Sequence, residues 1–429
     1  MASNALINNS IITREALAIR RNTNDFIQNI DRQYQSQFAR EGAKIGATLN
    51  VRLPNDYVVQ DGPVVNPEAT EERSIPITVN YRKNVPMTFS TQERTLNIDD
   101  FSERYIAPAV NALLGQVASD AMTLALDVSN MVLNQDADGN LLSPNPNTWL
   151  RAKAKLTECN APLNDRYAVL DPNTDANTVA AMANMFNPTD RISTQTIDGQ
   201  MGSKILGVKG WMQDQTVAIS VGGAYDSKAT ATGAYGSYLP NGQPAPVVTI
   251  SSVTSPHSSA ITVSAINGGL NKGDIITIEG VNAVNRVTKK DRHTLQQFVV
   301  LADCPSGSTA IPVSPAIIPP KEDGTPVPYQ TVAKAPQSGA AVKMVNPQGK
   351  AIRRNLLYSK KALTMVTVDL ELVRAGVVDC GRASLDGISL RTLTYYNGSD
   401  DTRGTRLDVL YGLAMLRGDW ACIVPELAE

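Results

Sequence analysis

The spacing of apolar residues changes several times along this chain of 429 residues, and each change predicts a different kind of element. Residues 1–44 hold short apolar clusters between charged residues, a pattern that predicts one or two amphipathic helices. Their apolar positions are Leu17, Phe26, Ile30, Tyr34 and Phe38. A helical N-terminal arm of this kind either packs on its own domain or docks on another subunit.

Period-two alternation begins at residue 45. Val51 and Leu53 flank Arg52, and apolar side chains alternate again from Ile75 to Val79, so two long strands are predicted. The residues that interrupt them are Gly62, Pro63 and Pro67. The hairpin contains few large apolar residues, so it cannot bury itself and must lie on another surface. Residues 45–98 are therefore predicted to form an extended β-loop.

The strongest helical pattern covers residues 99–134. Apolar residues recur there at helical spacing over more than thirty positions, after an acidic start at Asp99 or Asp100. This pattern predicts one continuous rod of about 50 Å, packed on several sides. A second helix is predicted from Thr148 to Cys159, followed by a buried strand from Arg166 to Leu170.

A capped helix is predicted to follow that strand and to end near Asn187. Alternating helix and strand indicate a mixed α/β body, with residues 99–172 as spine helix and peripheral domain. Residues 173–222 are predicted to be the first part of an axial domain.

Short β runs dominate residues 223–345, so this stretch is predicted to be an inserted β-barrel or sandwich domain. The runs are VVTISSV, AITVSA, DIITIEGV, QQFVVLA and STAIPVS. The exception is the stretch from Arg286 to Gln297, whose spacing is helical. Both histidines of the chain, His257 and His293, fall in this insert without a metal-ligand pattern beside them, so no site is expected there.

Strands return in residues 346–429, which are predicted to close the axial and peripheral domains. The run from Arg406 to Leu413 places Leu407, Val409 and Tyr411 on one face, after a polar turn. The basic pairs of this tail are Arg353 with Arg354 and Lys360 with Lys361. Ten acidic residues share the tail, so these pairs are interpreted as a solvated surface rather than a phosphate site.

Composition removes several function classes. Lysine and arginine total 39 against 41 aspartates and glutamates, so no global basic field exists to gather nucleic acid. Four cysteines lie far apart without a C-x-x-C pair, which argues against a zinc ribbon and a disulfide framework. No run of 18 apolar residues and no signal-peptide core is found, so neither export nor a membrane partner is expected.

Motifs of enzyme chemistry are also missing from the sequence. The stretch DGQMGSKILG lacks the spacing of a phosphate-binding loop, and no nucleophile elbow or H-E-x-x-H pattern occurs. We therefore predict no catalytic, cofactor-binding or metal-binding residue. Most of the chain is predicted to form extended arms, a long helix and an inserted domain, which suits a protein that assembles with copies of itself.

The order of these parts resembles the major capsid (coat) proteins of tailed bacteriophages. More narrowly, it is similar to the coat-protein group of short-tailed Salmonella phages, which carries a β-barrel-like insertion domain on the Hong Kong ninety-seven type capsid fold. The motifs that carry the resemblance are KIGATLNVRLP, VVQDGPV, NIDDFSERYIAPA, DGQMGSKILGVKGW and GDIITIEGV. The implied fold class is α+β, and the implied function is a structural major capsid protein without enzymatic activity.

The resemblance also implies partners. The chain would assemble with itself in hexamers and pentamers, first as a scaffolded procapsid that then expands. The other partners would be a scaffolding protein, a portal protein at one vertex and packaged double-stranded DNA without sequence specificity. The protein would reside in the virion capsid, and in the host cytoplasm during assembly. No lysine–asparagine crosslink between subunits is expected.

Charged residues of the N-terminal arm and the extended β-loop are the candidates for contacts between subunits. They are Arg14, Arg20, Arg21, Arg52, Asp61, Glu68, Glu71, Glu72, Arg73, Arg82 and Lys83. The same charges also suit a solvated strand edge protected against aggregation, and the two interpretations are compatible. Two other function classes stay open at this point: a β-rich fibre or receptor-binding protein, and an enzyme with an unrecognised cleft.

Overall fold

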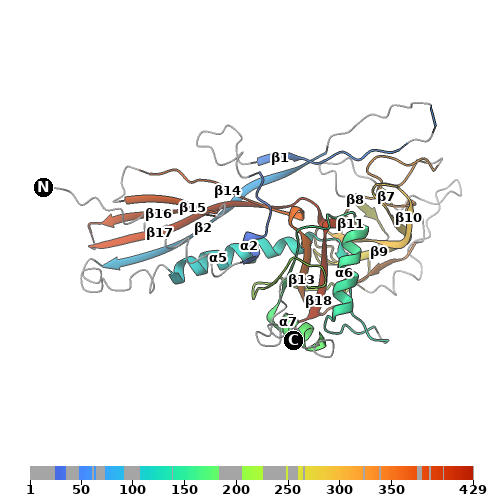
Figure 1. Ribbon diagram of the computed structural model, residues 1–429, viewed down its shortest axis with the longest axis horizontal. Coiled ribbons are helices and arrows are strands. Elements are labelled where there is room, and N and C mark those ends of the chain that lie inside the picture. Colours follow the sequence, from blue (N-terminus) through green and yellow to red (C-terminus); the bar gives the residue numbers. More distant parts are fainter. Residues whose placement is uncertain are drawn as a thin grey trace. The chain divides into compact units, whose positions relative to one another are not determined.

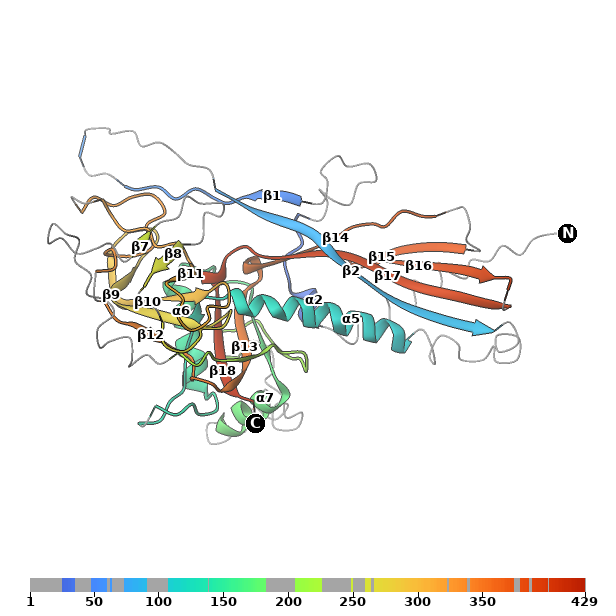
Figure 2. The same cartoon turned by 180° about the vertical axis from the view of Figure 1, so that it is seen from behind.

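The computed structural model shows a mixed helix and strand protein (Figures 1 and 2). The residues it describes are 25–34, 48–59, 62–63, 73–90, 107–137, 139–182, 205–225, 248–249, 259–263, 266–321, 324–337, 340–373, 379–385, 388–399 and 401–428. They form two compact units. The first draws on residues 1–51, 76–122 and 363–414, and the second on residues 52–75, 123–362 and 415–429.

The first unit is built on a six-stranded sheet that we call the arm sheet. Its strand order is β1-β2-β17-β16-β15, and β14 also pairs with β17. The strands are β1 (Thr48–Arg52), β2 (Ser74–Ser90), β14 (Leu363–Thr367), β15 (Asp379–Leu385), β16 (Ile388–Asn397) and β17 (Thr402–Met415). β16 and β17 form the hairpin that the polar turn predicted, and Leu407, Val409 and Tyr411 lie buried on one face as expected.

One edge of the predicted hairpin is paired within the same chain. β2 is 17 residues long and pairs antiparallel with β17, from Ser90 opposite Thr402 to Val79 opposite Gly412. A Cβ atom at Gly412 would lie 2.6 Å from the carbonyl oxygen of Thr78, so this close approach requires glycine. The return limb is thus held by its own chain (Figure 1).

The predicted continuous helix over residues 99–134 is wrong at its C-terminal end. The α-helix α5 (Ala107–Met122) passes into a 3-10 turn, η2 (Thr123–Asp127), and the short strand β3 (Asn130–Met131) follows. The helical path ends at Asp127, and Asn130 is held in β3 instead: its side-chain amide donates to the carbonyls of Asp419 and Ala421, and β3 pairs in parallel with β18. The expected start at residues 99–106 lies outside the described residues.

Hydrophobic burial explains the composition of α5. The stretch Pro108–Asp127 is apolar and long enough to cross a membrane, and half of it is buried inside the protein. The face formed by Val110, Leu113, Leu114 and Val117 is buried in the core. Of the expected N-terminal arm, the structure describes residues 25–34, which begin with the short helix α2 (Asp25–Gln28), where Phe26 and Ile27 are buried.

A second six-stranded sheet, which we call the mixed sheet, organises the second unit. Its strand order is β3-β18-β13-β4-β5, with β6 pairing β13. The further strands are β4 (Arg166–Leu170), β5 (Gly210–Gln213), β6 (Ile219–Val221), β13 (Ala351–Ser359) and β18 (Ala421–Leu427). β4 has the bounds that the sequence predicted. It is paired on both edges, with β13 and β5, and all its residues are buried, as is typical of a central strand covered on both faces.

Helix α6 (Pro146–Glu158) packs on this sheet and confirms the second predicted helix. Asn145 caps its first turn in a capping box with Thr148, and Trp149, Ala152 and Leu156 form the buried stripe. Beyond its last turn, the buried guanidinium of Arg166 donates to the carbonyls of Lys153, Ala161 and Pro162. These bonds hold the segment after α6 against the last turns of the helix.

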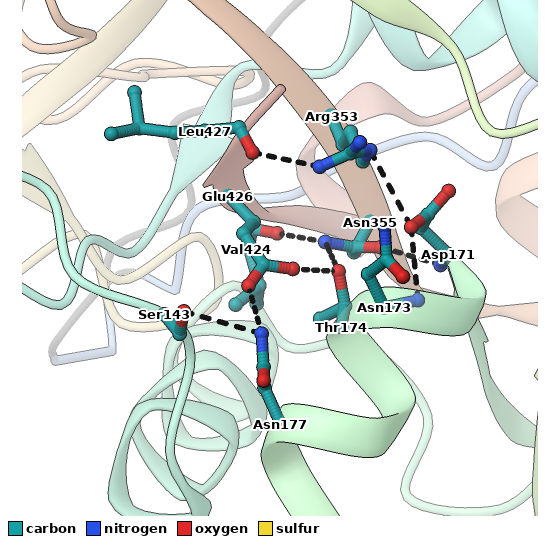
Figure 3. A network of polar contacts seen from close by, with 10 residues as sticks. All are labelled: Ser143, Asp171, Asn173, Thr174, Asn177, Arg353, Asn355, Val424, Glu426 and Leu427. Carbon is teal, nitrogen blue, oxygen red and sulfur yellow. Dashed lines mark hydrogen bonds and ion pairs between the residues drawn. The ribbon is translucent and has the colours of Figure 1, made fainter. Parts of the chain in front are cut away.

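Figure 3 shows how the C-terminal strand is fixed to helix α7 (Pro172–Met182) and β13. The carboxylate of Glu426 accepts hydrogen bonds from Thr174 and from Asn177, the latter at 2.7 Å. Asn355 donates to Thr174 at 3.0 Å and to the carbonyl of Val424 at 3.1 Å. These buried polar groups therefore have hydrogen-bond partners, and the C-terminal half of β18 is held in place by them.

A third sheet, the insert sheet, contains the strands predicted within residues 223–345. Its order is β12-β9-β10-β11-β8-β7. The strands are β7 (Val248–Thr249), β8 (Ser259–Thr262), β9 (Ile275–Val284), β10 (Asp291–Val300), β11 (Ala310–Ser314) and β12 (Val342–Met344). Ile276, Ile278 and Phe298 are fully buried in its core.

The helical spacing from Arg286 to Gln297 does not correspond to a helix, because most of this stretch is strand β10. Asn285 accepts hydrogen bonds from the backbone N–H groups of Val287 and Thr288, which forms a turn instead of a helix. His293 has φ +54° and the β9–β10 register shifts around it. This irregularity breaks the period-two pattern by which a strand is recognised in sequence.

Candidate assembly interface: the anchored arm

The extended β-loop predicted at residues 45–98 is called the extended arm from here on. Its described residues are 48–59, 62–63 and 73–90. The sequence assigns this segment to contacts with another subunit. Among the residues that the structure describes, no group of histidine, cysteine or acidic side chains could hold a metal ion. The arm is held at two places, one in each compact unit, and each anchor is polar.

The first anchor fixes β2 to α5 and β17 within the first unit. Lys83 Nζ lies 3.0 Å from the Asp120 carboxylate, and the hydroxyl of Tyr411 donates to the same carboxylate at 2.6 Å. The ring of Tyr81 stacks on Tyr411 with centroids 5.4 Å apart. Burial alone would raise the pKa of Asp120, but hydrogen bonds from Tyr411, Gln116 and Lys83 together hold it below its usual value of 3.8.

Replacing Tyr411 by phenylalanine is expected to cost about 2 kcal/mol of unfolding free energy at neutral pH, because a hydrogen bond to a charged group is lost. The pKa of Asp120 in the folded wild-type protein lies below the unfolded value, so its contribution is present above about pH 3.8 and is lost as the pH falls through the folded value. The cost of Tyr411→Phe should therefore shrink in acid. Urea unfolding of both proteins at several pH values between 3 and 7 measures how this cost changes with pH.

Tyr81→Phe is the matched control for this substitution, because it keeps the ring stack on Tyr411 and leaves the Asp120 hydrogen bonds in place. A loss for Tyr411→Phe no larger than that for Tyr81→Phe, or one independent of pH, would contradict the assignment.

The second anchor lies in the second unit, where the base of the arm contacts the insert. The backbone N–H of Leu53 donates to the carbonyl of Arg73 at 2.8 Å, which closes the two limbs. Asn55 accepts a hydrogen bond from the Tyr329 hydroxyl at 3.0 Å, and the guanidinium of Arg73 lies 3.7 Å from the centroid of the same ring. A cation over an aromatic face contributes about 0.5–2 kcal/mol.

Arg286 is the centre of this second anchor. Its Nε lies 2.5 Å from Asp56 of the arm, and its Nη1 lies 3.5 Å from Asp419, just before β18. Burial disfavours its charge, but Asp419 and Asp56 outweigh burial and raise the pKa of Arg286 above its usual value. One guanidinium thus joins the arm, the insert and the C-terminal segment.

Further contacts hold the insert sheet on the mixed sheet. The side-chain amide of Gln297 accepts from the N–H of Met131 and donates to its carbonyl, both at 3.0 Å, so it pairs with the edge strand β3 as a backbone would. Arg292 pairs with Glu158 at 2.5 Å, and Lys272 with Asp127 at 3.3 Å. The junction is therefore polar rather than a continuous apolar core.

Arg354 corrects the interpretation of the basic tail as a solvated surface. It is 1% exposed, and it donates to Ser220 at 2.6 Å and to the carbonyl of Gly273 at 2.8 Å. Burial lowers its pKa to about 10, partly offset by Asp274. Side chains alternate between the two faces of β13, and that of Arg354 points inward. Arg354 therefore connects the mixed sheet with the start of the insert sheet. Lys361, in contrast, is exposed as predicted.

The predicted contact residues divide into two sets. Arg73 and Lys83 take part in the intrachain anchors, Arg82 lies 4.0 Å from Asp408 of its own chain, and Arg52 is exposed on β1. The others lie outside the described residues: Arg14, Arg20, Arg21, Asp61, Glu68, Glu71 and Glu72. Contact with a neighbouring subunit stays a prediction for both sets.

Sequence reasoning missed Arg286, Gln297 and Asp408. Asp408 is fully buried between Arg391 and Arg406, each 2.5 Å away. Its position between Leu407 and Val409 assigns it to the opposite face of β17, which the alternation pattern marks as polar. No pattern in the sequence shows that this face is covered as well.

The family of the chain follows from a comparison with known proteins. A family model described as P22 coat protein, gene protein 5, matches residues 65–423. The chain belongs to the P22 coat protein family. It is a major capsid protein that forms the shell of a phage, and the α+β tailed-phage capsid fold expected from the sequence is confirmed. Self-assembly into an oligomeric capsid and residence in the virion capsid follow from the same assignment.

Solved structures similar to this coat protein include phage capsids. One is from Mycobacterium phage Che8, with 9% identity over 93% of this chain and 90% of that chain and a TM-score of 0.44. The capsid of Ralstonia phage GP4 has 6% identity over 94% and 87%, with a TM-score of 0.45. The CUS-3 coat protein I-domain has 31% identity over 30% of this chain and 96% of that chain, with a TM-score of 0.18. No curated protein matches the chain.

Proposed function

We propose that this coat protein builds its shell through the extended arm, which lies over an adjacent subunit in the pentamers and hexamers of the capsid. The same heterologous interface can close into a ring of five subunits or a ring of six, so one kind of contact builds both pentamers and hexamers. Many weak copies of the contact then act together, so the shell is stable although each contact is not.

The observation that carries this proposal is the exposure of the arm next to an anchored base. Tyr57 is 69% exposed and Val59 85% exposed, directly after Asn55 and Asp56, which the insert holds. Two large apolar side chains at alternate positions of a fixed, extended segment are suited to covering by another protein surface.

The remaining parts of the proposal concern partners. Assembly proceeds in the host cytoplasm on a scaffolding protein, with a portal protein at one vertex, and the procapsid then expands. The net charge of −2 suits a shell that encloses double-stranded DNA without gripping it or reading its sequence. The role is structural, and the proposal includes no enzymatic step.

The proposal keeps the divisions predicted from the sequence. They are the helical N-arm at 1–44, the extended loop at 45–98, spine and peripheral domain at 99–172, the axial domain at 173–222, the insert at 223–345 and the closing strands at 346–429. The insert sheet, whose strands fall within residues 248–344, supports the division at the insert.

Deleting Asp61–Glu72 is expected to abolish shell formation while the monomer stays folded. Both anchors of the arm lie outside this segment, so its removal leaves Asp56, Arg73 and Lys83 in place. The monomer is checked by circular dichroism and urea unfolding, and the shells by sedimentation and electron microscopy. A variant in which a Gly-Ser linker of equal length replaces the segment separates lost contacts from lost length. Shells of normal size from either variant would contradict the proposal.

A further inference from the structure

A cavity of about 660 Å³ lies in the second unit where the insert sheet meets α6. Arg151, Lys155 and Glu158 of α6 line one side, Met131 of β3 and Asp136 lie beside them, and Gln297 of β10 lines the insert side. The cavity therefore borders the polar junction that fixes the insert.

The acidic side chains that line this cavity have partners among the described residues, and two of its basic side chains do not. Glu158 pairs with Arg292 at 2.5 Å, and the Asp136 carboxylate accepts hydrogen bonds from the backbone N–H and side-chain amide of Asn140 at 2.8 and 3.0 Å. The side chains of Arg151 and Lys155 have no ion pair or hydrogen bond to any described residue. Since they stand four residues apart on one helix, both cations face the same part of the cavity.

We propose that this cavity receives the acidic run Glu68, Glu71 and Glu72 from the arm of a second copy of the chain. The inference rests on the proposed function and names the receptor for the arm. The sequence supplies a complementary occupant, because these three glutamates fall within five residues of the segment that the proposed function places on a neighbour. Thirteen residues separate Val59 from Arg73, and a folded-back chain of that length can span at most about 20 Å.

A carboxylate-bearing segment suits the cavity better than an apolar one. Of the two cations, Lys155 is partly buried and Arg151 is exposed. An incoming carboxylate therefore gains most beside Lys155, where less water competes with the contact. Apolar contact is also available, because Val132, Leu133 and Val345 line the same cavity. Added salt screens such pairs, so the contact should weaken as ionic strength rises.

The test is a charge swap within the full-length protein. Arg151→Glu with Lys155→Glu is expected to lower the yield of closed shells roughly tenfold or more, because many interfaces fail together. Glu71→Lys with Glu72→Lys should do the same. All four substitutions in one chain should restore shells, since complementary charges then meet again. Lys360→Glu with Lys361→Glu, a reversed basic pair outside the cavity, is the matched control and should leave the yield unchanged.

Each other outcome overturns the proposal. Shells that form normally from both reversed variants, or a combined variant that stays as deficient as either, exclude this receptor. Normal empty shells that fail only in DNA packaging would assign the cations to phosphate instead. A shift in monomer unfolding for the glutamate variant would mean that the run binds its own chain. If a reversed variant misfolds by circular dichroism, the neutral pair Arg151→Gln and Lys155→Gln replaces it, with assembly measured against salt.

The failure of this inference is distinguishable from failure of the proposed function. If deleting Asp61–Glu72 abolishes shells but the swap restores nothing, the arm still mediates assembly and only its receptor is wrong. If the deletion leaves normal shells, the proposed function itself fails.

Discussion

Replacing Asp408 by alanine is expected to lower the free energy of unfolding by about 3–5 kcal/mol, because the change leaves a buried arginine without its counter-charge. Asp408 is fully buried, and Arg391, itself 7% exposed, lies 2.5 Å from it. Arg406 lies at 2.5 Å from the other carboxylate oxygen. The carboxylate thus compensates two guanidinium groups on adjacent strands of the arm sheet.

Urea unfolding of the monomer measures this loss, with Asp369→Ala as the matched control. Asp369 pairs with Arg382 at 3.6 Å, but both side chains are about a quarter exposed, so its removal should cost at most about 1 kcal/mol. The double substitution Asp408→Leu with Arg391→Met should be milder than Asp408→Ala, because it removes the uncompensated charge. Equal losses for Asp408→Ala and Asp369→Ala would contradict the account of the arm sheet.

Replacing Arg286 by methionine should release the base of the arm. The substitution removes the ion pairs to Asp56 and Asp419 and leaves two carboxylates without their partner, at an expected cost of about 2 kcal/mol. Methionine keeps the apolar stem, so packing changes little. Limited proteolysis of the monomer should cut the arm faster, and shells should form less readily since the arm is no longer pre-organised.

Arg292→Met is the matched control for the second prediction. Arg292 holds the insert against α6 through Glu158 and has no contact with the arm among the described residues. It should cost similar stability without faster cleavage of the arm. If both variants are cleaved in the arm at the same rate, Arg286 is not the anchor that we infer.

Much of the local structure was predictable because local signals and tertiary contacts agree. The run RYAVL has no polar position on either face after Arg166, and it became a strand buried on both faces. Asn145, Pro146 and the apolar stripe of α6 specify a capped helix without reference to the rest of the chain. The insert strands follow from short β runs between turn residues.

One physical cause explains the misses at residues 128–134, at the two buried charges and at β2: tertiary partners decided the outcome. Nothing in the spacing of residues 128–134 reveals that Asn130 bonds the C-terminal segment as part of a strand. Likewise, Arg354 and Asp408 have the sequence context of surface charges, yet other strands cover them. The pairing of β2 with β17 joins residues more than 300 positions apart, and no single sequence encodes that register visibly.

The candidate site was predicted in outline only. The segment and its charges were identified, because a thin, charged hairpin needs another surface. Its anchors were identified only in part. Arg73 and Lys83 are among the predicted residues, but Arg286 belongs to the stretch whose spacing suggested a helix. A reader of the sequence alone therefore finds the arm but only some of the residues that fix it.

Electron microscopy of the purified protein, alone and expressed with its neighbouring phage genes, tests the central claim most directly. The account predicts closed icosahedral shells, or sheets and rings of capsomers, built from this chain. A monodisperse monomer or a slender trimer that never closes under either condition would contradict it, and would make the insert a binding module of a fibre.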